Sequence, residues 1–234
     1  MKPKQLFEEI SAWIAAAGPC KDPEFLARYL GSPRPIHVIN NALLRQKARS
    51  ITRENSLTVN EYQQLLNLLY SGPYFEHRTL AGVLLSQLPE LRAQLDLKQF
   101  EQWLAGLIGW CEIDMNCQSG WTAQELLDRW PEWQSFLTEC AHSENISLRR
   151  ASLVLLVSPL RESSDDQLTD QALNTVQLLK SEKAILITKA ISWVLRSMTR
   201  HQPDTVQNFL DEHEKSLPAI AMRETKRKLA TGKK

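Results

Sequence analysis

The chain has 234 residues, of which 43% are hydrophobic and 24% charged, and its formal net charge is +1. This composition is typical of a globular protein, and the length allows one sizeable core or one elongated array of repeats. No apolar run approaches the roughly 20 residues that span a bilayer, and Met1-Lys2-Pro3-Lys4 leads into an amphipathic pattern rather than an apolar signal core. We therefore expect a cytoplasmic protein without membrane contact.

The cysteines and histidines argue against a metal site. None of the C-x-x-C spacings typical of zinc sites occurs among Cys20, Cys111, Cys117 and Cys140. The five histidines form no H-E-x-x-H and are not accompanied by a C-x-x-C, so a metal hydrolase or a zinc deaminase has little support. We expect reduced thiols, no metal and no other cofactor.

Apolar residues recur at helical spacing along almost the whole chain, and no run alternates apolar and polar residues between hairpin turns. The pattern predicts an all-α fold. Short breaks such as Ser71-Gly72-Pro73 and Ser158-Pro159 separate the periodic stretches. In chain order, the predicted helices cover residues 4–17, 22–30, 39–53, 58–70, 75–88, 97–108, 110–118, 122–129, 132–142, 146–158, 165–180, 182–199, 203–214 and 219–230.

Several of these helices begin at residues that cap well. Thr58 precedes one helix, Thr122 has Glu125 three residues on, and Asp204 follows Pro203. Helix pairs joined by tight turns are typical of HEAT-like repeats, which bury one face against the next repeat. We predict a single domain over residues 1–234, a monomer, folded as a curved α-solenoid with a concave surface lined by one helix of each pair. An irregular helical bundle fits the same periodicity about equally well.

The basic residues gather in a few places although the total charge is close to zero. A strongly basic composition, common in nucleic-acid binders, is absent, but a neutral total can hide one positive face. The basic clusters are Arg45, Lys47, Arg49 and Arg53, then Arg149 and Arg150, then Arg223, Lys226, Arg227 and Lys228, with Lys233 and Lys234 at the end. The C-terminal cluster, which ends at Lys233 and Lys234, is more typical of a solvated tail than of a segment that recognises DNA sequence.

The most informative segment is Gly109-Trp110-Cys111-Glu112-Ile113-Asp114. Trp110 and Asp114 are four residues apart, so they share one helix face and put an aromatic plane beside a carboxylate. Two later segments place Arg150 and a second tryptophan, Trp193, at matching places in neighbouring helical units. Two indoles, one carboxylate and one guanidinium together predict a binding cleft.

These segments carry a family likeness. The chain resembles the AlkD type of bacterial alkylpurine DNA glycosylases, which are HEAT-like repeat DNA alkylation repair proteins. The likeness covers most of the chain, and its most specific piece is Lys189-Ala190-Ile191-Ser192-Trp193-Val194-Leu195-Arg196 followed by Pro203-Asp204. Its other parts are Ala27-Arg28-Tyr29-Leu30, Ile39-Asn40-Asn41 with Arg45, the Trp110 to Asp114 segment, Asn145 to Ala151, and the last unit through Met222-Arg223-Glu224.

The resemblance implies that Trp110, Asp114, Arg150 and Trp193 form the active cleft of a base excision enzyme. It implies double-stranded DNA with alkylated purines as the partner, and a bacterial cytoplasmic protein that is nucleoid-associated when bound to DNA. One departure is plain: relatives commonly have an acidic residue directly after the first tryptophan, whereas Cys111 stands here with Glu112 beyond it. A shifted alignment, a changed substrate preference and a lost activity all fit this departure.

The chemistry of alkylated purines fits these residue types. A purine alkylated at N3 or N7 is positively charged, so its glycosidic bond is weakened and the leaving base needs no general acid. A carboxylate such as Asp114 stabilises the oxocarbenium character of the sugar and orients the attacking water. The indoles of Trp110 and Trp193 offer cation–π contacts, and the planar fork of Arg150 suits a phosphate. No lysine needs to form a Schiff base, so the enzyme is expected to be a monofunctional hydrolase.

Further DNA contacts are expected from residues near these segments, and each has a plainer interpretation. The candidates are Asn40, Asn41, Arg45, Arg149 and Lys189. Asn40 and Asn41 also suit a helix cap, and Arg150 also suits a salt bridge to Glu144. Arg196 is as well explained by a tie between helices. Trp103, Trp121, Trp130 and Trp133 are expected in the core or at its rim, and Trp13 in the first helix pair.

Two other functions fit the sequence. A non-catalytic HEAT-like module that binds DNA of unusual shape is favoured by Cys111 at the expected acidic position. A protein-interaction scaffold, which helical solenoids often provide, is favoured by the modest net charge. DNA binding without base release indicates the first alternative, and no DNA binding at low salt indicates the second.

Overall fold

The computed structural model describes residues 2–232, and within them the secondary structure is helical, with an isolated bridge between Pro19 and His37 and no strand. The chain divides into two compact units, Met1–Gly120 and Trp121–Lys234. The predicted all-α class is confirmed. No helix among the described residues combines the length and the apolar character that crossing a membrane requires.

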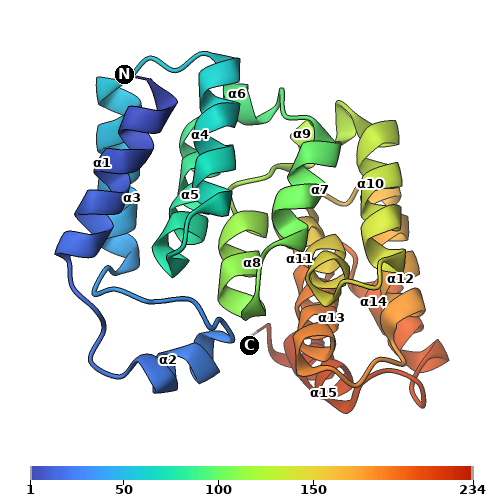
Figure 1. Cartoon of the computed structure of the whole chain (residues 1–234). Helices are drawn as coiled ribbons and strands as arrows, with labels where there is room; N and C mark the ends of the chain where they lie inside the picture. The colour runs from blue at the N-terminus through green and yellow to red at the C-terminus, as the bar shows by residue number, and fades with distance from the viewer. Residues whose placement is uncertain (1, 233–234) are drawn as a thin grey trace. The chain divides into compact units, whose positions relative to one another are not determined.

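The first unit consists of two layers of helices and a short helix beside them (Figure 1). In one layer α3 packs on α5 and α5 on α8, and in the other α1 packs on α4. Trp103 joins α7 to α4, since its indole stacks on Tyr70 at 4.8 Å and donates to Asn67 at 2.7 Å. The helices are α1 (Pro3–Ala16), α2 (Pro23–Leu30), α3 (Asn41–Glu54), α4 (Val59–Ser71), α5 (Phe75–Gln87), α6 (Pro89–Arg92), α7 (Leu97–Ala105) and α8 (Gly109–Cys117).

The second unit repeats this arrangement (Figure 1). In one layer α11 packs on α13 and α13 on α15, while α10 and α12 pack against each other and against α11. The helices are α9 (Ala123–Leu127), α10 (Trp130–His142), α11 (Ile146–Glu162), α12 (Asp166–Leu179), α13 (Ile185–Met198), α14 (Pro203–Glu212) and α15 (Ala219–Thr231). Layers of paired helices are the hallmark of HEAT-like repeats, so this part of the prediction is confirmed too.

One helix in the middle of each unit is buried almost all round. In α5 every residue from Phe75 to Leu85 is buried, and in α11 nearly every residue from Ser147 to Leu160 is. A helix with neighbours on several sides needs no single apolar stripe, and neither helix has a pronounced one. The polar residues of these helices are therefore buried too, and they must find partners inside the protein.

The predicted helices agree with the structure to within about three residues at each end, with two exceptions, and one predicted cap is wrong. The sequence pattern missed the single turn of α6, which begins at Pro89. The break predicted at Ser158-Pro159 is wrong, because α11 continues through Pro159 to Glu162 in a buried stretch whose packing outweighs one lost hydrogen bond. Asp204 is not a cap, since α14 begins at Pro203 after Gln202 and Asp204 lies in its first turn.

The predicted caps and core tryptophans otherwise hold. Thr58 and Glu61 form a capping box, and the Thr122 hydroxyl accepts from the amide of Glu125. Trp13 of α1 lies near α3, where Lys47 Nζ is 5.7 Å from its ring centroid. The indoles expected in the core are all buried there, namely Trp103, Trp121, Trp130 and Trp133.

Candidate functional site

Helix α8 presents two different faces. Glu112, Ile113, Asn116 and Cys117 are buried, and they follow one another at helical spacing on the side that packs on α5. Trp110 and Asp114 lie on the other side, where both are half-buried. The predicted pairing of an indole and a carboxylate on one face of a helix is therefore present.

Glu112 fixes the start of α8 through a buried carboxylate. Its oxygens accept from the Ser32 hydroxyl at 2.5 Å, from Arg34 Nε at 3.1 Å and from the backbone amide of Ile108 at 2.9 Å. Arg34 also donates to the carbonyl of Gly106 at 2.8 Å. A buried carboxylate needs such partners, and these tie the loop after α2 to the turn that begins α8.

Asn116 fixes the other end of the same face. Its side-chain oxygen accepts from the buried hydroxyl of Tyr70 at 2.5 Å, and its amide group donates to the carbonyls of Arg78 and Glu112 at 3.1 and 2.8 Å. Gly82 lets α5 come close at this point, since a Cβ there would lie 2.4 Å from the carbonyl oxygen of Met115. The helix that carries Trp110 and Asp114 thus has little freedom to turn.

Helix α2 covers the start of α8 through two glycines. Gly31 and Gly109 have φ of 74° and 76°, and a Cβ on Gly109 would lie 2.4 Å from the carbonyl oxygen of Gly31. This approach brings Tyr29 to Trp110, whose indole N–H donates to the Tyr29 carbonyl at 2.6 Å and whose ring meets the Tyr29 ring edge to face at 5.7 Å. The orientation of Trp110 is therefore set by α2.

Cys111, which directly follows Trp110, is a half-buried thiol. Burial, together with the nearby charges of Asp114 and Glu112, raises the pKa of Cys111 to about 12. Cys111 is thus neutral at physiological pH and supplies neither the charge of a carboxylate nor a thiolate nucleophile.

In the second unit Arg150 and Arg149 hold α11 to the start of α13. Arg150 is buried, and its Nη1 donates to the carbonyl of Leu186. Arg149 pairs with Glu182 through Nε at 2.6 Å and donates to the carbonyls of Ser143 and Glu144 at 2.8 Å. These bonds have a structural role.

Trp193 is half-buried on α13, with one cation on its ring and others on nearby positions of the helix. Lys189 is exposed and lies one turn earlier, on the same side of the helix as Trp193. Arg161 places its guanidinium carbon 5.6 Å from the Trp193 ring centroid. Arg196 contacts Glu224 at 3.3 Å and donates to the Ser192 carbonyl at 3.1 Å, so it does tie α13 to α15 as the plainer interpretation expected.

The start of α3 bears the remaining predicted contacts. Asn40 is the cap of this helix, because its side chain accepts from the amide of Leu43 at 3.0 Å. Asn41 is the first residue of the helix, and Arg45 is exposed one turn further on. Helix amides and a guanidinium in this order suit an anion such as phosphate.

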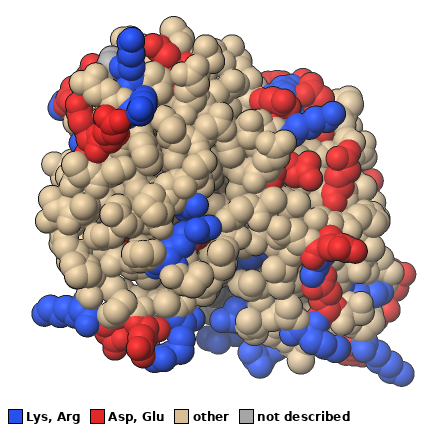
Figure 2. Space-filling model, viewed as in Figure 1, with Lys and Arg blue, Asp and Glu red and all other residues tan. Residues whose placement is uncertain are grey.

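Charges elsewhere on the surface are mixed. Figure 2 shows acidic and basic side chains interspersed over the visible face, with wide uncharged areas between them. In the basic C-terminal segment Lys226 pairs with Glu214 at 2.9 Å, and Lys233 and Lys234 lie outside the described residues.

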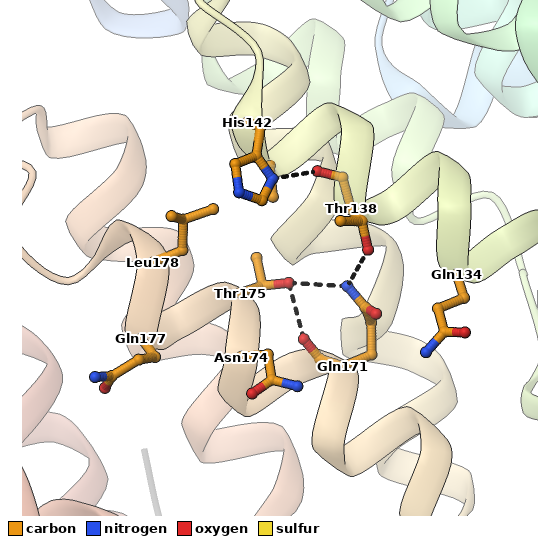
Figure 3. A pocket seen from close by; sticks show the side chains of 9 residues that line it. Gln134, Thr138, His142, Gln171, Asn174, Thr175, Gln177 and Leu178 are labelled. Carbon is orange, nitrogen blue, oxygen red and sulfur yellow. Dashed lines mark hydrogen bonds between the residues drawn. The ribbon is translucent and has the colours of Figure 1, made fainter.

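A pocket of about 430 Å³ lies between α10 and α12 and is unrelated to these residues (Figure 3). His142 Nδ1 donates to the Thr138 carbonyl at 2.9 Å, and Gln171 donates to the Thr175 hydroxyl at 3.3 Å. Apart from His142, none of the lining residues has an ionisable side chain. The pocket therefore lacks the positive charges that would bind a phosphate backbone. The lining residues are Gln134, Thr138, Ala141, His142, Gln171, Asn174, Thr175, Gln177 and Leu178.

The predicted site residues all belong to one layer of their unit. Asn41, Arg45, Trp110 and Asp114 stand on α3 and α8 of the first unit. Arg149, Arg150, Lys189 and Trp193 stand on α11 and α13 of the second. The structure brings Trp110 together with Asp114, and Trp193 together with Arg161, which the sequence did not single out. The class is thus a helical-repeat protein with an aromatic and charged site on one helix layer of each unit.

Comparison with known sequences identifies the family. Residues 11–229 match the profile of the DNA alkylation repair enzyme family, and this match extends through both units. The chain belongs to that family, as the resemblance predicted. No curated protein matches the chain by sequence.

Solved structures show the same fold at low sequence identity. A predicted DNA alkylation repair enzyme from Enterococcus faecalis superimposes with a TM-score of 0.70 and 17% identity, over 99% of this chain and 98% of its own. AlkD2 from Streptococcus mutans gives 0.57 and 14%, over 89% and 96%. The smu.31 protein from Streptococcus mutans UA159 gives 0.56 and 15%, over 80% and 90%.

Proposed function

We propose that the protein is a monofunctional DNA glycosylase that hydrolyses the N-glycosidic bond of cationic N3- or N7-alkylated purines in duplex DNA. The observation that carries the proposal is the anchored face of α8, where buried Glu112 and Asn116 hold Trp110 and Asp114 on the opposite side. Membership of the DNA alkylation repair enzyme family supports alkylated DNA as the substrate.

Asp114 has the central role in this proposal. As the bond between C1′ and the base nitrogen breaks, its electrons leave with the cationic base, which becomes neutral without a proton. The carboxylate of Asp114 stabilises the positive charge left on the sugar and orients the water that adds to C1′. Water loses its proton to this carboxylate or to solvent, and the products are free base and an abasic site.

Trp110 and Trp193 recognise the positive charge of the lesion. Each indole face offers a cation–π contact worth about 0.5–2 kcal/mol, which a neutral purine does not gain. Trp110 is held for this purpose by its hydrogen bond to the Tyr29 carbonyl. Selectivity for cationic lesions follows from this difference.

The DNA backbone is bound by exposed groups at helix ends. Asn40, Asn41 and Arg45 offer phosphate contacts at the start of α3, and Lys189 offers one beside Trp193. Arg150 remains the proposed phosphate ligand of the cleft, and because it also bonds the Leu186 carbonyl, its loss is expected to disturb α13 as well. Arg149, engaged by Glu182, ranks behind these residues as a DNA contact.

Measurement of base release tests the proposal. Wild-type protein is incubated with a duplex containing 7-methylguanine, and free base is quantified under single-turnover conditions. We expect release by the wild type and a loss of at least about 100-fold in Asp114→Asn, since one electrostatic contact to a transition state is worth that much. Equal release by both proteins, or none by the wild type, would contradict the proposal.

A double-mutant cycle tests whether the residues of both units act on one nucleotide. Asp114→Asn and Trp193→Phe are combined, and the rate constants for base release are compared. Residues that stabilise the same transition state are expected to couple by about 0.5–3 kcal/mol, whereas independent sites give additive effects. We further propose that the protein is a monomer in the bacterial cytoplasm and is nucleoid-associated when bound to DNA.

A DNA-binding module without base excision is the second candidate. It is favoured by the neutral thiol of Cys111, which leaves this part of α8 with less negative charge than relatives commonly have. In that case the duplex binds in a salt-dependent manner and no base is released.

A further inference from the structure

The indole of Trp193 already has a cation of the protein on it. Arg161 lies in the last turn of α11 and Trp193 in the middle of α13, and these two helices pack closely. The distance of 5.6 Å from Arg161 Cζ to the ring centroid is within cation–π range. In the free protein, the ring proposed to receive a cationic base is therefore occupied on one side.

The side chain of Arg161 has no other polar partner in the part of the chain that the structure describes. Across residues 2–232 its guanidinium has no ion pair and no hydrogen bond. Glu224, the carboxylate that pairs with neighbouring Arg196 at 3.3 Å, also accepts from the Ser192 hydroxyl at 2.6 Å. The indole is thus the principal partner of the Arg161 charge.

The surroundings of Arg161 favour an incoming anion. Partial burial of the guanidinium and the charge of neighbouring Arg196 lower the pKa of Arg161, so its charge lacks full compensation. Lys189, on the same side of α13 as Trp193, is exposed and adds a further positive charge. Cations near one indole, with Glu224 already engaged by Ser192 and Arg196, attract a phosphate group.

We propose that Arg161 is an exchangeable cation, which covers Trp193 in the free protein and moves to a backbone phosphate of the bound duplex, leaving the indole face to the alkylated base. The inference rests on the proposed function and adds a positioning residue to it. A charge-assisted fork to a phosphate is stronger than a partly exposed cation–π contact, so the exchange is downhill once DNA is present. No covalent step is involved.

The plainer explanation is that Arg161 complements the dipole at the end of α11. A cation in the last turn of a helix is favourable, but any cation serves, and it gains nothing from leaving when DNA binds. Arg161→Lys keeps this charge and loses the planar fork. The two explanations therefore predict different behaviour of Trp193 in the DNA complex.

Fluorine NMR of protein labelled with 5-fluorotryptophan follows Trp193 directly. Trp193→Phe assigns its resonance, and Arg161→Ala marks the position of the uncovered indole. In free protein, the wild type and Arg161→Ala are expected to differ at this resonance alone. With a saturating unmodified duplex, the two resonances are expected to converge. Arg227→Ala, which removes an exposed arginine of α15 without an indole contact, is the matched control and should leave the Trp193 resonance unchanged.

A difference that persists in the DNA complex would overturn the proposal, because Arg161 would then still lie on the indole. Convergence in inorganic phosphate at equal ionic strength would overturn the requirement for a DNA backbone. Salt dependence of duplex binding gives a second readout: in Arg161→Ala the slope of log K against log salt should fall in magnitude by about one. A slope equal to that of the wild type would contradict a phosphate contact.

This experiment separates the inference from the chemistry, because unmodified DNA is used. Convergence without base release from 7-methylguanine duplex would overturn the proposed hydrolysis and leave the exchange standing. Base release without convergence would overturn the exchange and leave the hydrolysis standing.

Discussion

Glu112 anchors the start of α8 in the first unit. Its carboxylate is fully buried and joins Ser32, Arg34 and the amide of Ile108, residues that lie far away in the sequence or before the helix. Glu112 does not belong to the exposed side of α8 that carries Trp110 and Asp114, because its side chain is buried in the unit.

Substitution Glu112→Gln should lower the free energy of unfolding by about 2–3 kcal/mol, because charge-assisted hydrogen bonds to a buried carboxylate are lost. Urea denaturation measures this change. Glu8→Gln, at an exposed position of α1, is the control and should stay within about 0.5 kcal/mol of the wild type. Equal stability of Glu112→Gln and the wild type would show that the carboxylate is not an anchor.

Cys111 should resist alkylation in the folded protein. Its pKa of about 12 leaves almost no thiolate at pH 8, and the thiolate is the reactive form. We expect iodoacetamide to modify Cys111 at least about 100-fold more slowly in folded than in urea-unfolded protein at this pH. Mass spectrometry of the peptide containing Cys111 gives both rates, and similar rates would contradict a protonated, half-buried thiol.

At the scale of elements, α2 and the start of α8 meet through the backbone atoms of two glycines. Gly31 and Gly109 both have positive φ and approach so closely that a methyl group does not fit between them. The aromatic surface of α2 follows from this contact, with Tyr29 against Trp110 and Phe25 stacked on Tyr29 at 6.0 Å. The orientation of Trp110 thus depends on α2 as well as on α8.

Gly109→Ala and Gly18→Ala form a matched pair, since both glycines have positive φ but only Gly109 is crowded. Positive φ alone should cost Gly18→Ala about 1–2 kcal/mol. Gly109→Ala should lose at least about 2 kcal/mol more, because its Cβ would overlap backbone oxygens that have no room to move away. Urea denaturation of both variants gives the difference, and equal losses would mean that the close approach has no energetic weight.

For the whole molecule, His77 links stability to pH. It is fully buried at the start of α5, where Nδ1 accepts from the amide of Tyr74 at 3.1 Å and Nε2 donates to the Ser11 hydroxyl, 3.0 Å away. Ser11 in turn donates to the Phe7 carbonyl, which fixes the proton of the neutral imidazole on Nε2. Burial, aided by the charge of Arg78, lowers the pKa of His77 to about 4.

This lowered pKa predicts acid sensitivity. The unfolded chain binds the proton near pH 6.5 and the folded protein only near pH 4, so His77 stabilises the fold above pH 6.5 and loses this contribution as the pH falls to 4. The expected loss is about 3 kcal/mol. Glu76 works in the opposite direction, because burial raises its pKa.

Comparison of the pH dependence in wild type and His77→Gln isolates the histidine term. The wild type should lose more stability than the variant between pH 6.5 and 4, as urea denaturation at each pH measures. Proton NMR of the folded wild type should show no titration of the His77 ring near pH 6.5. A midpoint at that pH would contradict the prediction whatever the stability curves show.

The sequence by itself determined the helical class, nearly all of the helices and the family. Helical spacing of apolar residues is a local property, and so are the capping box of Thr58 and the one-turn spacing of Trp110 and Asp114. It failed at Pro159 because the burial of α11, which depends on helices distant in sequence, offsets the hydrogen bond that proline cannot make.

The surroundings of the site residues were decided by the tertiary structure alone. Glu112 meets Ser32 across 80 positions, and Arg149 meets Glu182 across 33, pairings that no local spacing encodes. From the sequence we predicted Arg149 as a DNA contact, whereas in the structure it pairs with the carboxylate of Glu182. No sequence pattern pointed to Arg161, which lies on the Trp193 ring. The physical reason is that the spacing of residues along a helix determines which face they share, whereas their partners depend on which helices pack together.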